Sequence, residues 1–242
     1  MEFLQIAAIV FTAILVHTLA GFGAALVAMP LLIGFLDPIA AASLVSLIGL
    51  TIQSILLRRY WRQLRPRALW RLMLATLIGI PLGVEVVVRL DTTLVLGGLG
   101  LFLIAYALYT LIGPRLPAIA HPRWSYMFGF ASGLLGGAYN MAGPPYVIYG
   151  MCREWTPDQF RINLQMLFMV SGTFVGINHL VRGHYDAQVL QGYLIALPMI
   201  VLGALVGMWL DRFVNQQVFR RILLVMLLII GVQLILASIT TR

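Results

Sequence analysis

The most informative part of the sequence is residues 128–150, which read FGFASGLLGGAYNMAGPPYVIYG. It is apolar and long enough to cross a bilayer, which takes about 20 residues. Pro144 and Pro145 lie side by side within it. Each proline removes a backbone donor and clashes with the preceding turn, so the pair predicts a helix that breaks near the middle of the membrane. Backbone groups freed by such a break cannot face lipid and must be buried in protein or line a wet cavity.

The same break predicts a binding site for an anion. A half-helix that begins inside the membrane presents free N–H groups and the positive end of its dipole. Glycines let a ligand approach the backbone, and the amide of Asn140 can donate to an oxyanion without losing a proton. The predicted substrate-binding residues of this stretch are Gly136, Gly137, Tyr139, Asn140, Gly143 and Pro144. The alternative interpretation is a packing face of small residues around a proline kink.

A similar stretch lies near the N-terminus, where residues 17–32 read HTLAGFGAALVAMPLL. Gly21, Gly23 and Pro30 repeat the pattern with one proline and no asparagine, and they complete the predicted substrate-binding set. His17 precedes these glycines by about one helical turn. Because histidine titrates near neutral pH, His17 could carry a proton or contact the anion. A neutral histidine that is hydrogen-bonded between helices fits the sequence equally well.

Apolar segments follow one another along the whole chain of 242 residues. Charged residues make up 10% of the chain, against roughly 25% in a soluble domain. The predicted fold class is all-α: a polytopic integral membrane protein with about eight transmembrane helices, whose first and fifth segments are broken. The expected segments are 3–35, 39–57, 68–88, 92–112, 123–150, 160–181, 187–210 and 218–240.

The chain is also predicted to consist of two related four-helix halves. Two patterns recur in the same order, namely Gly23 to Pro30 with Gly137 to Pro144, and Gly79-x-x-x-Gly83 with Gly203-x-x-x-Gly207. The second pattern is more typical of close helix packing than of a binding site. The predicted organisation is a first transmembrane repeat at 1–113, a cytoplasmic linker at 114–122 and a second transmembrane repeat at 123–242. Secondary transporters commonly bind their substrate between such repeats.

Arginine placement predicts the orientation. The chain has no lysine, and the connection at 58–71 holds Arg58, Arg59, Arg62, Arg65, Arg67 and Arg71. Positive residues collect in cytoplasmic loops, so this connection is assigned to the cytoplasm. With eight crossings both termini are then cytoplasmic, although Arg220 and Arg221 fall on the outer side. If one broken segment dips in and returns, the number of crossings falls to seven and the C-terminus moves outside.

Other function classes find no support in the sequence. The net charge of +8 is accounted for by arginines in cytoplasmic loops, so no nucleic-acid partner is expected. Cys152 is the only cysteine, which excludes an internal disulfide and a multi-cysteine metal site. The Walker A, haem-attachment, His-Glu-x-x-His and Gly-x-Ser-x-Gly motifs are absent. We therefore expect neither an enzyme nor a bound cofactor or metal.

These motifs resemble the TauE/SafE family of sulfite exporters. GFGAALVAMPLL (21–32), followed by Asp37-Pro38, looks like the Gly-rich opening signature of the family, and GLLGGAYNMAGPPYVIYG (133–150) looks like its second copy. FRINLQMLFMVSG (160–172), the Arg-rich turn and LGALVGMWLDR (202–212) extend the resemblance to nearly the whole chain. The resemblance implies transport of sulfite, sulfonates or related small organic anions across the cytoplasmic membrane.

The predicted function is that of a secondary transporter in the bacterial inner membrane. It would move a small (organo)sulfur or related organic anion by alternating access, with the anion bound mid-membrane between the two broken segments. The sequence leaves open export or import, a proton as the coupling ion, and assembly into a homo-oligomer. A passive anion channel and a non-transporting membrane subunit are the alternative functions.

Overall fold

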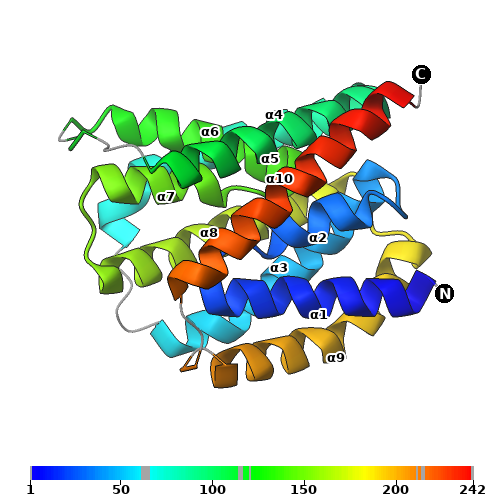
Figure 1. Cartoon of the computed structure of the whole chain (residues 1–242). Helices are drawn as coiled ribbons and strands as arrows, with labels where there is room; N and C mark the ends of the chain where they lie inside the picture. The colour runs from blue at the N-terminus through cyan, green and yellow to red at the C-terminus, as the bar shows by residue number, and fades with distance from the viewer. Residues whose placement is uncertain are drawn as a thin grey trace.

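The structure is a computed structural model of the chain that describes residues 2–60, 66–113, 117–119, 121–210, 212–213 and 216–240. In this part of the chain all regular secondary structure is helical, which confirms the all-α fold class (Figure 1). The helices are α1 (Glu2–Ala20), α2 (Ala24–Leu32), α3 (Pro38–Tyr60), α4 (Pro66–Arg89), α5 (Thr92–Ile112), α6 (Trp124–Tyr139), α7 (Gly143–Cys152), α8 (Pro157–Val181), α9 (Ala187–Leu210) and α10 (Gln216–Thr240).

Both predicted interruptions are present. Between α1 and α2, Gly21 and Gly23 have φ angles of 80° and 107°, and between α6 and α7, Asn140 has a φ angle of 57°. Glycine enters this left-handed region without a steric cost, and asparagine tolerates it, so these residues end the preceding helices. Pro144 and Pro145 lie in the first turn of α7, where their missing N–H groups cost nothing. The proline pair therefore begins a new helix rather than kinking an existing one.

Glycines on α4 and α6 allow these two helices to pack with their backbones in contact. A Cβ atom on Gly83 would overlap the carbonyl oxygen of Leu134, and one on Gly137 would overlap that of Ile80. Gly129 in turn meets the carbonyl oxygen of Leu72. Small residues permit this approach where lipid gives helices no hydrophobic reason to associate. The prediction that Gly79 and Gly83 serve helix packing is confirmed.

The packing of α1 against α9 has the same character. A Cβ atom on Gly203 would lie 3.0 Å from the carbonyl oxygen of Phe11, and one on Gly207 would lie 2.7 Å from the Cβ atom of Thr18. Gly203 and Gly207 are thus packing residues too, as predicted. In both cases the glycine pair of one half of the chain contacts the first helix of the other half.

Helices α6 and α7 form a hairpin that returns to the end of the bundle where it began. Ser125 in the first turn of α6 is hydrogen-bonded to the hydroxyl of Tyr149 in the last turn of α7, at 2.8 Å. The backbone N–H of Ile119, just before α6, donates to the carbonyl of Cys152 at 2.9 Å. The fifth hydrophobic segment is therefore re-entrant and does not cross the bundle.

Helices α1 and α2 form a second re-entrant hairpin. A Cβ atom on Gly192, near the start of α9, would lie 3.8 Å from Ile6 and 3.3 Å from Leu44. Ile6 is near the start of α1, and Leu44 is near the start of α3, which directly follows α2. The first segment thus begins and ends at one end of the bundle, whereas α6 begins at the opposite end, where α4 also begins. Two hairpins therefore enter from opposite ends and meet inside the protein.

About eight crossings were expected from the sequence, and the structure does not confirm that number. Within the described residues, six helices are long and apolar enough to cross a membrane, namely α3, α4, α5, α8, α9 and α10. The apolar part of α1, Leu4–Ala20, is shorter than these six helices. The expectation of about eight crossings treated each broken segment as one crossing. Because both segments turn back, they supply pairs of short helices instead, and α1 begins at the same end of the bundle at which α10 ends (Figure 1).

The prolines of the two broken segments occupy different helical positions. Pro30 is the seventh residue of α2, whereas Pro144 is the second residue of α7, so the equal Gly-to-Pro spacing does not mark equivalent helical positions.

Two predicted connections lie partly outside the described residues. These parts are residues 61–65 of the arginine-rich connection and residues 114–116 and 120 of the predicted linker. The side chains of Arg59 and Arg67 are also outside the described set.

Candidate anion-binding site

A cavity of about 80 Å³ lies where the two hairpins meet. Its wall is built from the α1–α2 break, the α6–α7 break, and the helices α3 and α8 that follow them. The lining is mostly apolar, and its polar side chains are His17, Ser46, Gln53, Asn140 and Ser171. A small molecule with both a polar and an apolar part therefore fits the chemistry of this wall.

His17 bridges the break between α1 and α2. The backbone N–H of Ala24, the first residue of α2, donates to its Nδ1 atom at 3.3 Å. A neutral imidazole carries one hydrogen, so with Nδ1 as the acceptor this hydrogen is on Nε2. The side chain is 3% exposed. His17 is thus held as a neutral cap on the N-terminus of α2.

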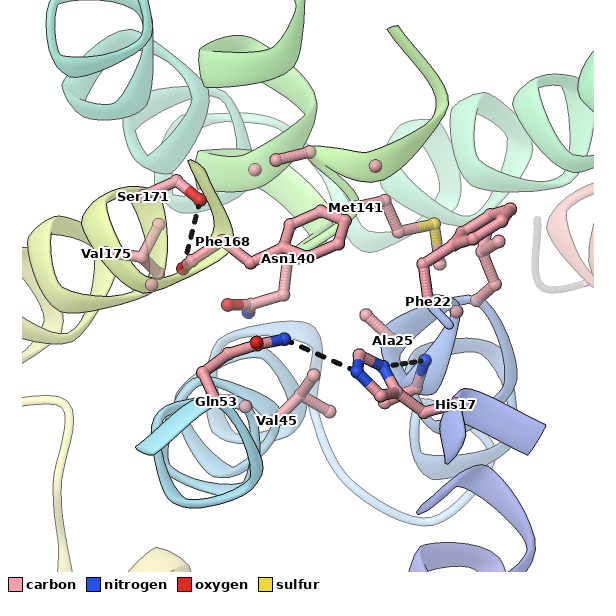
Figure 2. A pocket seen from close by; sticks show the side chains of 18 of the residues that line it. His17, Phe22, Ala25, Val45, Gln53, Asn140, Met141, Phe168, Ser171 and Val175 are labelled. Atoms are coloured by element: carbon pink, nitrogen blue, oxygen red, sulfur yellow. Dashed lines mark hydrogen bonds between the residues drawn. The ribbon is translucent and has the colours of Figure 1, made fainter. Parts of the chain in front are cut away.

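Gln53 on α3 faces His17 and the cavity (Figure 2). Its amide nitrogen lies 3.4 Å from Nε2 of His17. Two N–H groups cannot satisfy each other, so we assign the amide in the reversed orientation, in which its oxygen accepts from His17. The NH₂ group then occupies the position of the Oε1 atom, which is buried and has no partner among the described residues. Gln53 therefore presents an unused donor in the cavity wall.

Asn140 at the α6–α7 break presents its amide to the same space as Gln53 (Figure 2). Its Nδ2 atom donates to the carbonyl oxygen of Ala42 on α3 at 2.7 Å, which ties the second hairpin to the helix that follows the first. An amide nitrogen carries two hydrogens, and this bond uses one of them. The second hydrogen is available to a ligand.

The two half-helix N-termini contribute unequally to the cavity. The first intrahelical bond of α2 runs from Val27 to Gly23, so the amides of Ala25 and Leu26 have no acceptor within the helix. Both residues line the cavity. In α7 the second and third residues are prolines, so Gly143 alone brings a free first-turn amide. Backbone donors for an anion are therefore concentrated at α2.

Formal positive charge is missing from the described cavity wall. Its lining contains no arginine, and His17 is the one titratable side chain in it. Among the described residues, histidine, cysteine and acidic side chains form no group that could hold a metal ion. Recognition of an anion here would rest on neutral donors, helix dipoles and whatever charge His17 acquires.

The structure brings together part of the predicted site. The cavity is lined by Gly23, Gly136, Asn140, Gly143, Pro144 and His17. The other predicted residues lie beside it. Gly137 packs on α4, Pro30 is buried in α2, Tyr139 donates its hydroxyl to the carbonyl of Val95 at 3.2 Å, and Gly21 accepts a long 3.5 Å bond from Gln165.

Helices α3 and α8 supply lining residues that sequence reasoning did not assign to the site. Those on α3 include Ser46, Gly49 and Gln53, and those on α8 include Phe168, Ser171 and Gly172. Each group follows helical spacing, and each helix comes directly after a break. Small and polar residues recurring on one face of the helix after a broken segment were the signal that could have identified them.

Comparison with known proteins gives the chain its relatives. The family described as sulfite exporter TauE/SafE matches residues 6–234. A protein of Cupriavidus necator named "Probable sulfite/organosulfonate exporter TauE" is 28% identical over 231 residues, which cover 93% of this chain and 90% of that protein. A protein of Comamonas testosteroni named "Probable inner membrane transporter protein TsaS" is 27% identical over 178 residues, covering 72% and 74%. No solved structure matches the chain.

The family match extends from α1 into α10 and therefore includes both re-entrant hairpins and every lining residue of the cavity. The motifs quoted from the sequence, the six membrane-length helices and this match agree with one another. The chain is a multi-pass membrane protein, and it belongs to the sulfite exporter TauE/SafE family.

Proposed function

We propose that this protein is a secondary transporter that binds a small organosulfur anion, such as sulfite or an alkanesulfonate, in the cavity between the two hairpins. The observation that carries the proposal is the meeting of α2 amides, the Gln53 donor and the Asn140 donor in a wall otherwise made of apolar side chains. The donors suit an oxyanion, and the apolar part of the wall, including Phe22 and Phe168, suits a short carbon chain. The relative from Cupriavidus necator is named for sulfite and organosulfonates.

Alternating access is the transport mode that the arrangement of the two halves supports best. Residues 1–113 and 123–242 each contain one re-entrant hairpin followed by three long helices, and the hairpins enter from opposite ends. The glycine contact of α4 with α6 has its counterpart in that of α9 with α1. Inverted repeats of this kind place a substrate site at their interface and expose it by rocking one repeat against the other.

The arginines support one orientation of the chain. By position in the sequence, thirteen of the sixteen belong to the end of the bundle where α3 ends and α4 begins, and the other three are Arg89, Arg182 and Arg242. We name this end the arginine-rich face and place it in the cytoplasm. Arg220 and Arg221, which contradicted an eight-crossing arrangement, fall on this face because α10 begins there. Both termini are then periplasmic.

Purified protein in proteoliposomes tests the function. We expect uptake of a labelled alkanesulfonate to saturate with concentration and to be driven uphill by unlabelled anion loaded on the opposite side, an exchange that a carrier can perform and a passive channel cannot. Flux that stays proportional to concentration, with no such exchange, would indicate a passive channel. Absence of flux for sulfite and sulfonates alike, in protein that is folded and inserted, would indicate a non-transporting subunit.

A further inference from the structure

We propose that His17 takes up a proton when the anion binds, so that anion and proton occupy the cavity together and cross the membrane in the same direction. This inference rests on the proposed function and specifies its coupling ion. It starts from the position of His17, which lies at the N-terminus of α2 and is the one titratable side chain in the described cavity wall.

Charge is the first argument. Moving an ionised group out of water into a low-dielectric interior is costly unless a charge of opposite sign accompanies it. The described wall contains no arginine, and the chain contains no lysine. A protonated His17 beside a monovalent anion makes the cavity contents neutral overall. The empty cavity, by contrast, favours the neutral imidazole, because the side chain is 3% exposed and has no acidic neighbour in the wall.

The hydrogen bond from Ala24 to His17 links the protonation of His17 to the number of backbone N–H groups that are free to bind an anion. In the neutral state Nδ1 accepts from the amide of Ala24 at 3.3 Å. Protonation places a hydrogen on Nδ1 and ends this acceptance, so the amide of Ala24 becomes free together with those of Ala25 and Leu26. In an empty cavity an imidazolium would then face the positive end of the α2 dipole. An anion between them accepts from both, so each ligand favours the binding of the other.

The buried side chain of Gln53 is a second, independent indication that a hydrogen-bond acceptor binds in the cavity. The side chain is 5% exposed, and in the orientation assigned from His17 its NH₂ group is buried without a partner among the described residues. Buried donors are nearly always satisfied, and the wall around Gln53 offers a place for a ligand to satisfy it. An oxyanion would accept from Gln53 on one side and from His17 on the other.

The described side chains around His17 include no other group positioned to take its place. Helix α2 carries no titratable side chain, and α9 carries Tyr193, whose hydroxyl is bonded to Thr51 at 2.6 Å. The remaining titratable or charged groups of the surrounding helices whose side chains are described are Arg58 on α3, Tyr126 and Tyr139 on α6, Tyr146, Tyr149 and Cys152 on α7, Asp158, Arg161 and His179 on α8, and Arg221 on α10. None of these described side chains lines the cavity.

Calorimetry on the purified full-length protein tests the proposal. Methanesulfonate is the probe, because its sulfonate stays ionised and any proton taken up goes to the protein. Titrations near neutral pH in two buffers of different ionisation enthalpy should show uptake of about one proton per anion bound. The affinity should weaken about tenfold for each unit of rising pH where the free protein is unprotonated and the complex protonated.

Two variants assign the proton to His17. His17→Gln keeps a polar side chain at the position of Nε2 that cannot become charged, so anion binding should be weaker, independent of pH and free of proton uptake. His17→Asn, whose amide oxygen takes the position of Nδ1, is equally unable to become charged and should likewise bind without proton uptake. His121→Gln, which changes an exposed histidine outside the cavity, is the matched control and should behave like the parent.

The outcomes separate the two proposals. Methanesulfonate binding without proton uptake by the parent, or uptake that persists in His17→Gln, overturns the proton proposal and leaves the proposed function intact. A parent protein that binds neither methanesulfonate nor sulfite overturns the proposed function itself. Thermal melting of each variant shows whether it is folded, and if His17→Gln is not, His17→Asn decides the result.

Discussion

At the scale of single residues, Gly49 on α3 and Gly137 on α6 have opposite roles. Gly49 lines the cavity, and a Cβ atom added to it would meet nothing within 4 Å. A Cβ atom on Gly137 would overlap the carbonyl oxygen of Ile80 on α4. One glycine therefore borders open space, and the other allows two helices to touch.

We expect leucine at these two positions to give different defects. Gly49→Leu should fill the cavity and abolish anion binding while the melting temperature stays near that of the parent. Gly137→Leu should separate α4 from α6 and destabilise the protein by about 1–3 kcal/mol or more, as overpacking does. Thermal melting and methanesulfonate affinity of both variants, measured side by side, check this. A stable Gly137→Leu protein without affinity would instead make Gly137 part of the binding surface.

Asn140 is expected to contribute both a structural bond and a ligand contact. Asn140→Gly retains the left-handed backbone, since glycine adopts a φ of 57° freely, but it removes the bond to Ala42 and the donor for the anion. Methanesulfonate affinity should fall by about 1–3 kcal/mol. Asn178→Ala, which removes an amide on α8 outside the cavity, is the control. Equal affinities of the two variants would exclude Asn140 from the site.

Sequence reasoning reached the residues of the breaks and missed their neighbours for a physical reason. Glycine and proline show in the sequence because they alter backbone geometry, which is how Gly23, Asn140 and Gly143 were found. Whether a glycine faces a ligand or another helix depends on tertiary packing, so Gly136 and Gly137 could not be told apart. Ser46 and Gly49 lie in an unbroken helix and carry no backbone signal.

At the scale of helices, a buried hydrogen bond holds the second hairpin against α4. Oγ1 of Thr76 on α4 lies 2.9 Å from the carbonyl oxygen of Leu72 and 3.0 Å from that of Gly129 on α6, to which it can only donate. We therefore assign the hydroxyl of Tyr146 on α7 as the donor of its 2.8 Å bond to Thr76. Both Tyr146 and Thr76 are fully buried. This pair therefore links three helices through one hydroxyl group.

Removing one partner of this bond should cost more than removing both. Thr76→Val removes the partner of the Tyr146 hydroxyl on α4 and leaves only Ser171 on α8 beside it, so we expect a loss of about 1–3 kcal/mol in stability. Adding Tyr146→Phe should recover much of that loss, because no unsatisfied hydroxyl remains. Thermal melting of the two single variants and the double variant forms the required cycle. Strictly additive losses would contradict a bond that matters to the packing of α7.

The existence of the helices could be predicted, but the direction of the short ones could not. Apolar length gave segments such as 92–112 and 187–210, which coincide with α5 and α9. A break at Gly21 or Asn140 looks the same in the sequence whether the chain continues across or turns back. The choice depends on contacts such as that of Ser125 with Tyr149, between side chains far apart in the sequence.

At the scale of the whole molecule, the six membrane-length helices, the two re-entrant hairpins and the proposed cytoplasmic arginine-rich face together predict which parts of the chain share a side of the membrane. Alkaline phosphatase fused after the C-terminus should be active, and a fluorescent protein fused there should be dark, because both would be periplasmic. An epitope inserted after Gly113, where α5 ends at the arginine-rich face, should be reached from the cytoplasm only. A cytoplasmic C-terminus together with a cytoplasmic epitope would mean that one hairpin crosses the membrane after all.

The packing of α1 against α9 has a consequence for how the protein is made. Synthesis proceeds from the N-terminus, so α1 and α2 leave the ribosome long before the glycine surface of α9, with Gly203 and Gly207, exists. Helix α6, by contrast, finds α4 already in place when it emerges. The first hairpin can therefore complete its packing only when nearly the whole chain has been made. A chain that stops before α9 would leave this hairpin without its partner and open to quality-control proteases.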